Sequence, residues 1–144
     1  MKILVATEKP FAKKAVDGIR QIVEGAGYEL ALLEKYTDKS ELLSAVADVD
    51  ALIIRSDKVT AEVIEAARNL KIVVRAGAGY DNVDLAAATA RGIVVMNTPG
   101  QNSNAVAELA LAMMIFMARN GFTPGTGSEI QRSEERRVGK ECRL

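Results

Sequence analysis

The sequence has no histidine, no tryptophan, a single cysteine and only three prolines among its 144 residues. Without histidine, a mechanism that needs an imidazole base or a histidine-ligated metal cannot be completed within this chain, and we expect no metal site. The lone Cys142 excludes an intrachain disulfide. This cysteine usage is typical of a reducing compartment, so we expect a cytoplasmic protein.

Extremes of charge and long hydrophobic runs are also missing. Lysine plus arginine equals aspartate plus glutamate at 19 each, unlike the basic footprint of a nucleic-acid-binding protein. The longest apolar run, Leu109 to Ala118, is about half of the ~20 residues that a membrane span needs. With 49% apolar and 26% charged residues, the composition is that of an ordinary globular domain. We therefore expect neither a nucleic-acid nor a membrane partner.

The last segment, residues 132–144, differs in character from the rest of the chain. It is rich in charge and has no apolar period, so composition alone favours a solvated tail. The string Arg132 to Cys142 also resembles the translation of a sequencing-adapter oligonucleotide. We interpret 132–144 as an adapter artefact without order of its own and exclude it from the fold. On this interpretation the natural protein continues past Gln131 and the chain is its front.

Short apolar runs alternate with helical patterns up to residue 98. In the first helical pattern Ala15, Ile19, Ile22 and Val23 form the apolar stripe, Asp38 and Glu41 form a capping box, and Thr60 is a candidate cap. We expect strands at 2–7, 28–33, 51–54, 72–74 and 93–96, and helices at 11–24, 38–47, 60–68 and 84–91. The strands are continuous apolar runs, which predicts an α/β fold with a doubly wound parallel sheet covered on both faces.

A different pattern follows residue 100. Residues 104–119 have the length and composition of a helix, but their apolar residues surround the whole axis. Such a helix is buried on every side or requires a partner surface, and packing between domains explains it better than a cofactor slot. Residues 121–127 are rich in glycine, threonine and proline and are typical of a linker.

Candidate binding residues come from the carboxyl ends of the expected strands, where ligands bind in doubly wound sheets. Arg55 directly follows the third strand, and a guanidinium there can hold a carboxylate or phosphate through two parallel hydrogen bonds. Ser56 adds a hydroxyl beside it. The alternative is that Arg55 only pairs with a neighbouring acid at the rim of the sheet.

The string Gly77-Ala78-Gly79 follows the fourth strand, where its backbone N–H groups could approach an anion at a helix N-terminus. It is not a dinucleotide fingerprint, because Asn82 replaces the third glycine and no acidic residue ends the next strand. A cradle for a small anion and a plain tight turn remain the two interpretations. A phospho-accepting receiver domain is disfavoured, because the third strand is followed by Arg55 rather than ending in an aspartate.

Together these segments resemble the N-terminal region of the D-isomer-specific 2-hydroxyacid dehydrogenases over residues 1 to about 130. The resemblance is carried by Leu52-Ile-Ile-Arg-Ser56, Val73-Val-Arg-Ala-Gly-Ala-Gly-Tyr-Asp-Asn-Val-Asp84, Arg91-Gly-Ile-Val-Val-Met-Asn-Thr-Pro99 and Asn102-Ser-Asn-Ala-Val-Ala-Glu108. It implies a flavodoxin-like substrate domain at 1–98, built in the whole protein from both chain ends. Residues 99–131 would hold the crossing helix and linker that begin an otherwise missing Rossmann domain for NAD.

The resemblance also implies roles for individual residues. Arg55 and Ser56 would bind the phosphate or carboxylate of the substrate, the amides of Ala78 and Gly79 its carboxylate, and Asn102 the substrate as well. Ala78 and Val106 would lie near the nicotinamide of NAD. Family members often have a polar residue in place of Ala78, so a side-chain contact to the cofactor is absent here.

The implied activity is hydride transfer between NAD and a small D-2-hydroxy acid in a homo-oligomeric enzyme. The similarity is strongest to members that oxidise 3-phosphoglycerate at the entry to serine synthesis. The family's catalytic arginine and His–Glu pair come from later in the chain, so we expect no catalytic residue and no activity in these 144 residues alone. Two alternatives are the front of a glyoxylate or hydroxypyruvate reductase and a non-catalytic binding or assembly module.

Overall fold

The computed structural model describes residues 1–118 of the chain, and the predicted linker and adapter segments lie outside this range. Two compact units divide the chain, the first spanning Met1–Gln101 and the second beginning at Asn102. The first unit contains the sheet, and the second contributes one described helix. Each unit is treated by itself below.

Strands and helices alternate as the hydrophobic pattern predicts, with boundaries that differ by at most two residues. The strands are β1 (Lys2–Thr7), β2 (Glu29–Glu34), β3 (Ala51–Ile54), β4 (Ile72–Arg75) and β5 (Val94–Asn97). The helices are α1 (Lys13–Gly25), α2 (Lys39–Ala45), α3 (Ala61–Ala66), α4 (Leu85–Ala90) and α5 (Ser103–Ala118).

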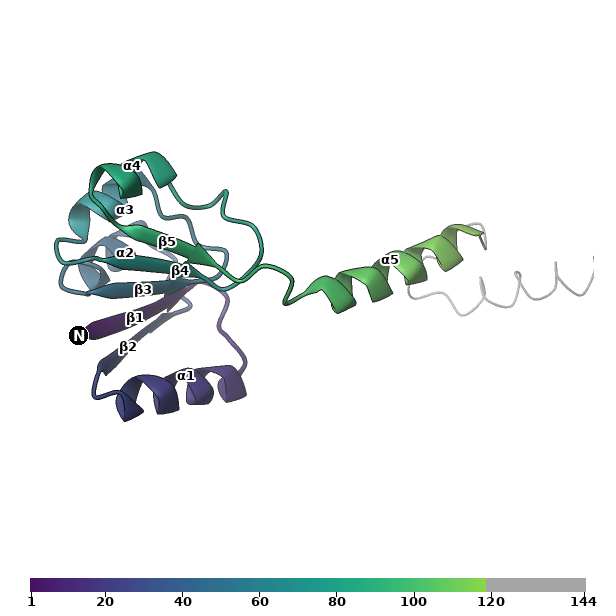
Figure 1. The fold of residues 1–144 in the computed structure, drawn as a ribbon, viewed down its shortest axis with the longest axis horizontal. Coiled ribbons are helices and arrows are strands. Elements are labelled where there is room, and N and C mark those ends of the chain that lie inside the picture. Colours follow the sequence, from purple (N-terminus) through teal and green to yellow (C-terminus); the bar gives the residue numbers. More distant parts are fainter. Residues whose placement is uncertain (119–144) are drawn as a thin grey trace, which may run out of the picture. The chain divides into compact units, whose positions relative to one another are not determined.

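The five strands form one parallel sheet in the order β2-β1-β3-β4-β5 (Figure 1). This is the flavodoxin-like order of a doubly wound sheet, so the predicted fold class is confirmed. The chain leaves β1 for β2 on one side and returns to add β3 on the other. The strand order therefore reverses between β1 and β3, which is where such folds bind ligands.

The core lies between the sheet and the helices α2, α3 and α4 (Figure 1). Leu52 and Val73, neighbours in the β3–β4 register, are both fully buried on this face. The other large side chains of this layer with almost no exposure are Ile54, Ile64, Val46, Val49, Val59 and Val63. Burying a side chain of this size contributes roughly 1.5–3 kcal/mol, so this layer accounts for most of the unit's stability.

The opposite face of the sheet is covered only in part, which corrects the prediction that both faces are covered. Helix α1 packs against β2 on this side (Figure 1). At the other end of the sheet Val94 is 55% and Met96 52% exposed, and Val74 beside Met96 is half-buried. The strands are apolar on both faces, but within this unit only one face has a full layer of helices.

Two details of the helices also differ from expectation. Ile22 was predicted on the apolar stripe of α1 but is 74% exposed. Helix α1 packs on the edge strand β2, and only a narrow stripe around Val23 faces that strand. Thr60 does stand at the N-cap of α3, yet its hydroxyl makes no capping hydrogen bond. The capping box of Asp38 and Glu41 at the start of α2 is present as predicted.

Helix α5 has apolar side chains on every side and no buried residue. Leu109, Met114 and Met117 are 62%, 65% and 77% exposed. The helix is thus of the kind that requires a partner surface. Across residues 1–118 no helix combines the length and hydropathy needed to cross a membrane.

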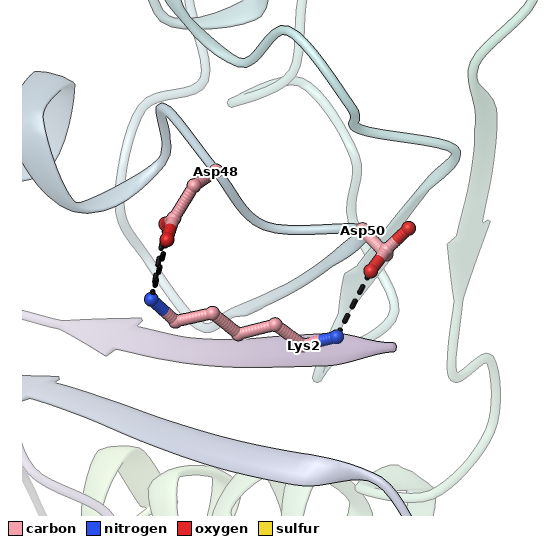
Figure 2. A network of polar contacts seen from close by, with 3 residues as sticks. All are labelled: Lys2, Asp48 and Asp50. Carbon is pink, nitrogen blue, oxygen red and sulfur yellow. Dashed lines mark hydrogen bonds and ion pairs between the residues drawn. The ribbon is translucent and has the colours of Figure 1, made fainter.

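The amino edge of the sheet is held by an aspartate between three strands. Asp50, just before β3, accepts hydrogen bonds from the Lys2 backbone N–H and the Lys71 ammonium, each at 2.9 Å. The Lys2 side chain extends away from Asp50 and pairs with Asp48 at 2.8 Å (Figure 2). The Lys2 backbone N–H, followed by Lys71, holds the pKa of the Asp50 carboxyl below its ordinary value.

This arrangement predicts a pH-dependent contribution of Asp50 to stability. Its pKa is lower in the folded than in the unfolded chain, so the carboxylate stabilises the fold fully above about pH 4 and loses this effect as pH falls through the folded-state pKa. We expect Asp50→Asn to lower the melting temperature at neutral pH, by an amount that shrinks toward about pH 3. Thermal melts of both proteins across this range measure it. The matched change Asp17→Asn on the exposed side of α1 should have little effect at any pH, and a pH-independent deficit in Asp50→Asn would contradict the prediction.

The exposed surface of α5 predicts that the isolated chain self-associates. A continuous apolar patch of this kind draws molecules together in water. Light scattering of the purified chain should give a mass above that of a monomer. Replacing Leu109 and Met113, which stand one helical turn apart, by glutamate should shift the protein toward the monomer. A clean monomer of the unaltered chain would show that α5 does not act in this way.

Candidate functional site

Four strands end together at the carboxyl edge of the sheet. The register places Ala6, Ile54, Arg75 and Asn97 in one row across β1, β3, β4 and β5. The segments that follow these residues therefore leave the sheet side by side. Both predicted groups of the first unit, Arg55-Ser56 and Ala78-Gly79, belong to such segments, on the neighbouring strands β3 and β4.

Arg55 and Ser56 are both exposed directly after β3. Within residues 1–118 the Arg55 guanidinium forms no ion pair with an acid, so the alternative of a rim ion pair is not observed there. Its carbon Cζ instead lies 6.0 Å from the ring centroid of Phe11, at the limit of a cation–π contact. The guanidinium is thus placed beside the switch point between β1 and β3 with its charge available.

Two carbonyl groups of the glycine segment after β4 accept hydrogen bonds, and two of its amides do not donate any within the described part of the chain. The Thr98 N–H donates to the Gly77 carbonyl at 2.9 Å, and the Asn97 side-chain amide donates to the Ala78 carbonyl at 2.8 Å. Among residues 1–118 no protein group accepts the N–H of Ala78 or of Gly79, and both residues are exposed. Two backbone donors are therefore available to an anion at this point.

Gly77 lies against the side chain of Arg75. A Cβ at this position would meet a terminal guanidinium nitrogen of Arg75, so a side chain there would require the flexible arginine side chain to move. The Nε of Arg75 is buried and has no hydrogen-bond partner among the described residues.

The prediction that this segment forms a helix N-terminus is wrong. Helix α4 begins only at Leu85, and its first turn is capped by Asp84, which accepts from the Ala87 N–H at 2.9 Å. Residues 76–84 instead form a loop held to the segment after β3. The Asn82 amide donates to the Asp57 carbonyl at 2.7 Å, and the Val59 N–H donates to the Asn82 carbonyl at 2.8 Å.

Sequence reasoning did not single out Asp57, the buried carboxylate of this edge. Its side chain is 3% exposed and accepts from the Glu8 N–H and the Tyr36 hydroxyl, both at 2.8 Å, and from the Arg55 N–H at 3.3 Å. Burial, and then the hydrogen bond to Asp57, raises the pKa of Tyr36 far above its ordinary value, so the hydroxyl stays protonated and donates. In the sequence Asp57 cannot be told from a solvated acid beside Arg55 and Lys58.

Asn102 and Val106 belong to the second unit. Asn102 directly precedes α5, and its carbonyl accepts from the Val106 N–H at 3.0 Å. Both residues are exposed. Their contacts with substrate and nicotinamide stay predictions.

Other sites are sparse in the described part of the chain. No group of three acidic, cysteine or histidine residues among 1–118 could hold a metal ion. A depression of about 180 Å³ lies along β5, lined by Tyr80, Leu85, Val95, Met96 and Asn97. Its lining is mostly apolar and does not include Arg55 or the free amides.

Comparisons with known proteins agree on one family. The model of the D-isomer specific 2-hydroxyacid dehydrogenase catalytic domain matches residues 4–139. The chain is 46% identical over 120 residues to D-3-phosphoglycerate dehydrogenase of Archaeoglobus fulgidus, covering 83% of this chain and 21% of that protein. It is 47% identical over 93 residues to hydroxypyruvate reductase of Thermotoga maritima, covering 64% of this chain and 30% of that protein.

A solved structure is similar in both sequence and fold. The NAD+-bound 3-phosphoglycerate dehydrogenase of Entamoeba histolytica is 56% identical, with a TM-score of 0.81 over 88% of this chain and 42% of that one. The chain thus spans less than half the length of these three relatives. From the family match over nearly its whole length, the chain belongs to the D-isomer specific 2-hydroxyacid dehydrogenases.

Proposed function

We propose that the chain is the substrate-binding front of an NAD-dependent oxidoreductase that transfers a hydride between NAD and a small D-2-hydroxy acid. The observation that carries the proposal is the pairing of an available guanidinium at Arg55 with two available amides at Ala78 and Gly79, at one edge of adjacent strands. One cation and two N–H donors suit an acid that bears two separate anionic groups. The Ser56 hydroxyl beside Arg55 adds a further donor.

The proposed substrate is 3-phosphoglycerate, which carries a phosphate and a carboxylate. In this proposal Arg55 and Ser56 bind the phosphate or carboxylate side, the amides of Ala78 and Gly79 bind the carboxylate, and Asn102 makes a further contact. Two relatives named for phosphoglycerate support this substrate. The T. maritima relative keeps hydroxypyruvate as the second candidate, because Arg55 suits any small anionic acid. A phosphoglycerate-oxidising parent would act in the cytoplasm at the entry to serine synthesis.

The described residues do not by themselves form a dinucleotide site. The loop after β4 has Asn82 in place of a third glycine and no helix N-terminus behind it, and β5 ends in Asn97 rather than in an acid. We therefore assign NAD mainly to a later part of the parent protein, with Ala78 and Val106 at its border. The proton donor or acceptor for the hydroxyl also lies there, because this chain has no histidine.

The half-covered sheet supports the proposed domain organisation. Residues 1–98 form the substrate domain, and the apolar strip of Val74, Val94 and Met96 is where a later segment of the parent would pack. Residues 99–131 carry α5 and the start of the NAD domain, whose surface α5 requires. The parent would be a homo-oligomer. Residues 132–144 are the proposed adapter segment, although the family match extends into it, to residue 139.

Activity assays should separate the chain from its parent. We expect the 144-residue chain to show no NAD-dependent oxidation of 3-phosphoglycerate, because residues 1–118 form no dinucleotide site and the sequence has no histidine. A sequencing read across the end of this reading frame should reveal a continuing frame with a Gly-x-Gly-x-x-Gly string, and the encoded parent should be active. Faster reduction of hydroxypyruvate or glyoxylate by the parent would favour the second candidate. A true stop after Leu144 in an independent copy would favour a non-catalytic module.

Substitution of Arg55 tests the proposed substrate contact in the parent. Loss of a charged hydrogen bond costs about 1.5–3 kcal/mol, so Arg55→Ala should raise the KM for 3-phosphoglycerate about 10- to 150-fold while the KM for NAD stays unchanged. The matched change Arg20→Ala removes only an exposed pair with Glu24 on α1. It should leave both constants unaltered. An unchanged KM for phosphoglycerate in Arg55→Ala would remove Arg55 from the site.

A further inference from the structure

Asp57 is a buried ionisable group that the proposed function does not use. It lies two residues after Arg55. Asp57 is only 3% exposed, whereas Arg55 and Ser56 are both exposed. Burying a carboxylate is costly unless it is satisfied by hydrogen bonds. Its position therefore needs a structural or functional reason.

The Asp57 carboxylate receives donors from three segments of the carboxyl edge. Oδ1 accepts from the Glu8 N–H, after β1, and from the Tyr36 hydroxyl, after β2, both at 2.8 Å. Oδ2 accepts from the Arg55 N–H at 3.3 Å, within its own segment. Among residues 1–118 no cation is paired with this carboxylate, so hydrogen bonds alone hold its charge.

The backbone of the same residue reaches the fourth segment. The Asp57 carbonyl accepts from the Asn82 side-chain amide at 2.7 Å, at the far end of the loop that carries Ala78 and Gly79. Residue 57 thus bonds to the segments that follow β1, β2 and β4 while belonging to the one that follows β3. No other residue of the proposed site makes comparable connections among the described residues.

We propose that Asp57 is a positioning residue for acid recognition, which fixes the backbone of Arg55 and Ser56 against the segments after β1 and β2. The inference rests on the proposed function, because it concerns how the Arg55 guanidinium reaches the substrate. The bond from Glu8 also sets the start of the loop that carries Phe11, over whose ring the guanidinium lies. Asp57 thus contacts the backbone of Arg55 directly. Through Glu8, it also contacts the segment that leads to Phe11, the ring beneath the Arg55 guanidinium.

An aspartate suits this task better than its neutral analogue. All three groups that face the carboxylate are donors, and an ionised carboxylate only accepts. Asparagine would direct an NH2 group at one of these donors and leave it unpaired. Hydrogen bonds to a charged acceptor are also roughly twice as strong as neutral ones.

The first experiment tests, in the 144-residue chain, whether the hydrogen bonds of Asp57 protect the backbone after β1 and β3 from exchange. Hydrogen exchange followed by mass spectrometry should show faster exchange in peptides that contain Glu8 and Arg55 in Asp57→Asn than in the unaltered chain. Asp17→Asn, an equal change of charge on α1, should leave these peptides unaltered. Tyr36→Phe removes one donor and keeps the carboxylate, so it should give a smaller increase and serves if Asp57→Asn fails to fold. Unchanged exchange at Glu8 and Arg55 in both Asp57→Asn and Tyr36→Phe would overturn the inference.

The second experiment measures the consequence in the parent enzyme. Asp57→Asn should raise the KM for 3-phosphoglycerate about tenfold while kcat and the KM for NAD stay within about twofold, the pattern of lost substrate binding. A variant that was only less stable would lose activity without this selective change in KM. If Asp57 acts through Arg55, adding Asp57→Asn to Arg55→Ala should raise KM no further. Full additivity of the two changes would show that Asp57 does not work through Arg55.

The outcomes separate this inference from the proposed function. If Arg55→Ala raises the KM and Asp57→Asn does not, the positioning role is wrong and the proposed function stands. If the parent is inactive on 2-hydroxy acids, or if Arg55→Ala has no effect, the proposed function is wrong. The positioning role, which rests on it, is then wrong as well. In that case faster exchange in Asp57→Asn would still show that Asp57 stabilises the backbone of the carboxyl edge.

Discussion

The parallel register of the strands is the constraint on which the rest of this structure depends. Because Ile54 pairs with Arg75 and both strands run in the same direction, Arg55 and the loop of Ala78 and Gly79 must leave the sheet at the same edge. A register in which one strand ran the other way would place them at opposite ends. The opposite edge, where Asp50 binds Lys2 and Lys71, contributes to holding that register.

The two edges of the sheet use aspartates for different purposes. Asp50 is reached by one backbone amide and one ammonium group near the surface, and its effect is on stability. Asp57 is enclosed, accepts only from backbone amides and a tyrosine hydroxyl, and stands beside the candidate site. Enclosure makes the hydrogen bonds of Asp57 costly to lose, because an unpaired donor in a buried place is far more costly than one in water.

Most of the fold could be predicted from local pattern. Short continuous apolar runs identify the strands, and Asp38 with Glu41 identifies the start of α2, because these signals act over a few residues. The exposure of Ile22 and of Met96 could not be predicted, since it depends on which helices cover which face. At the site, Arg55 and the glycine loop are visible from their position after strands. Asp57 is not, because its partners Glu8 and Tyr36 are distant in sequence and only the fold brings them to it.

The unbonded amides of Ala78 and Gly79 have an evolutionary consequence. They belong to the main chain, so replacing the alanine at 78 by another residue that keeps the loop's conformation leaves the two donors in place. If these amides hold the carboxylate as proposed, divergence in which acid is chosen falls on the neighbouring side chains, above all at positions 55 and 56, while the capacity to hold a carboxylate is inherited with the shape of the loop.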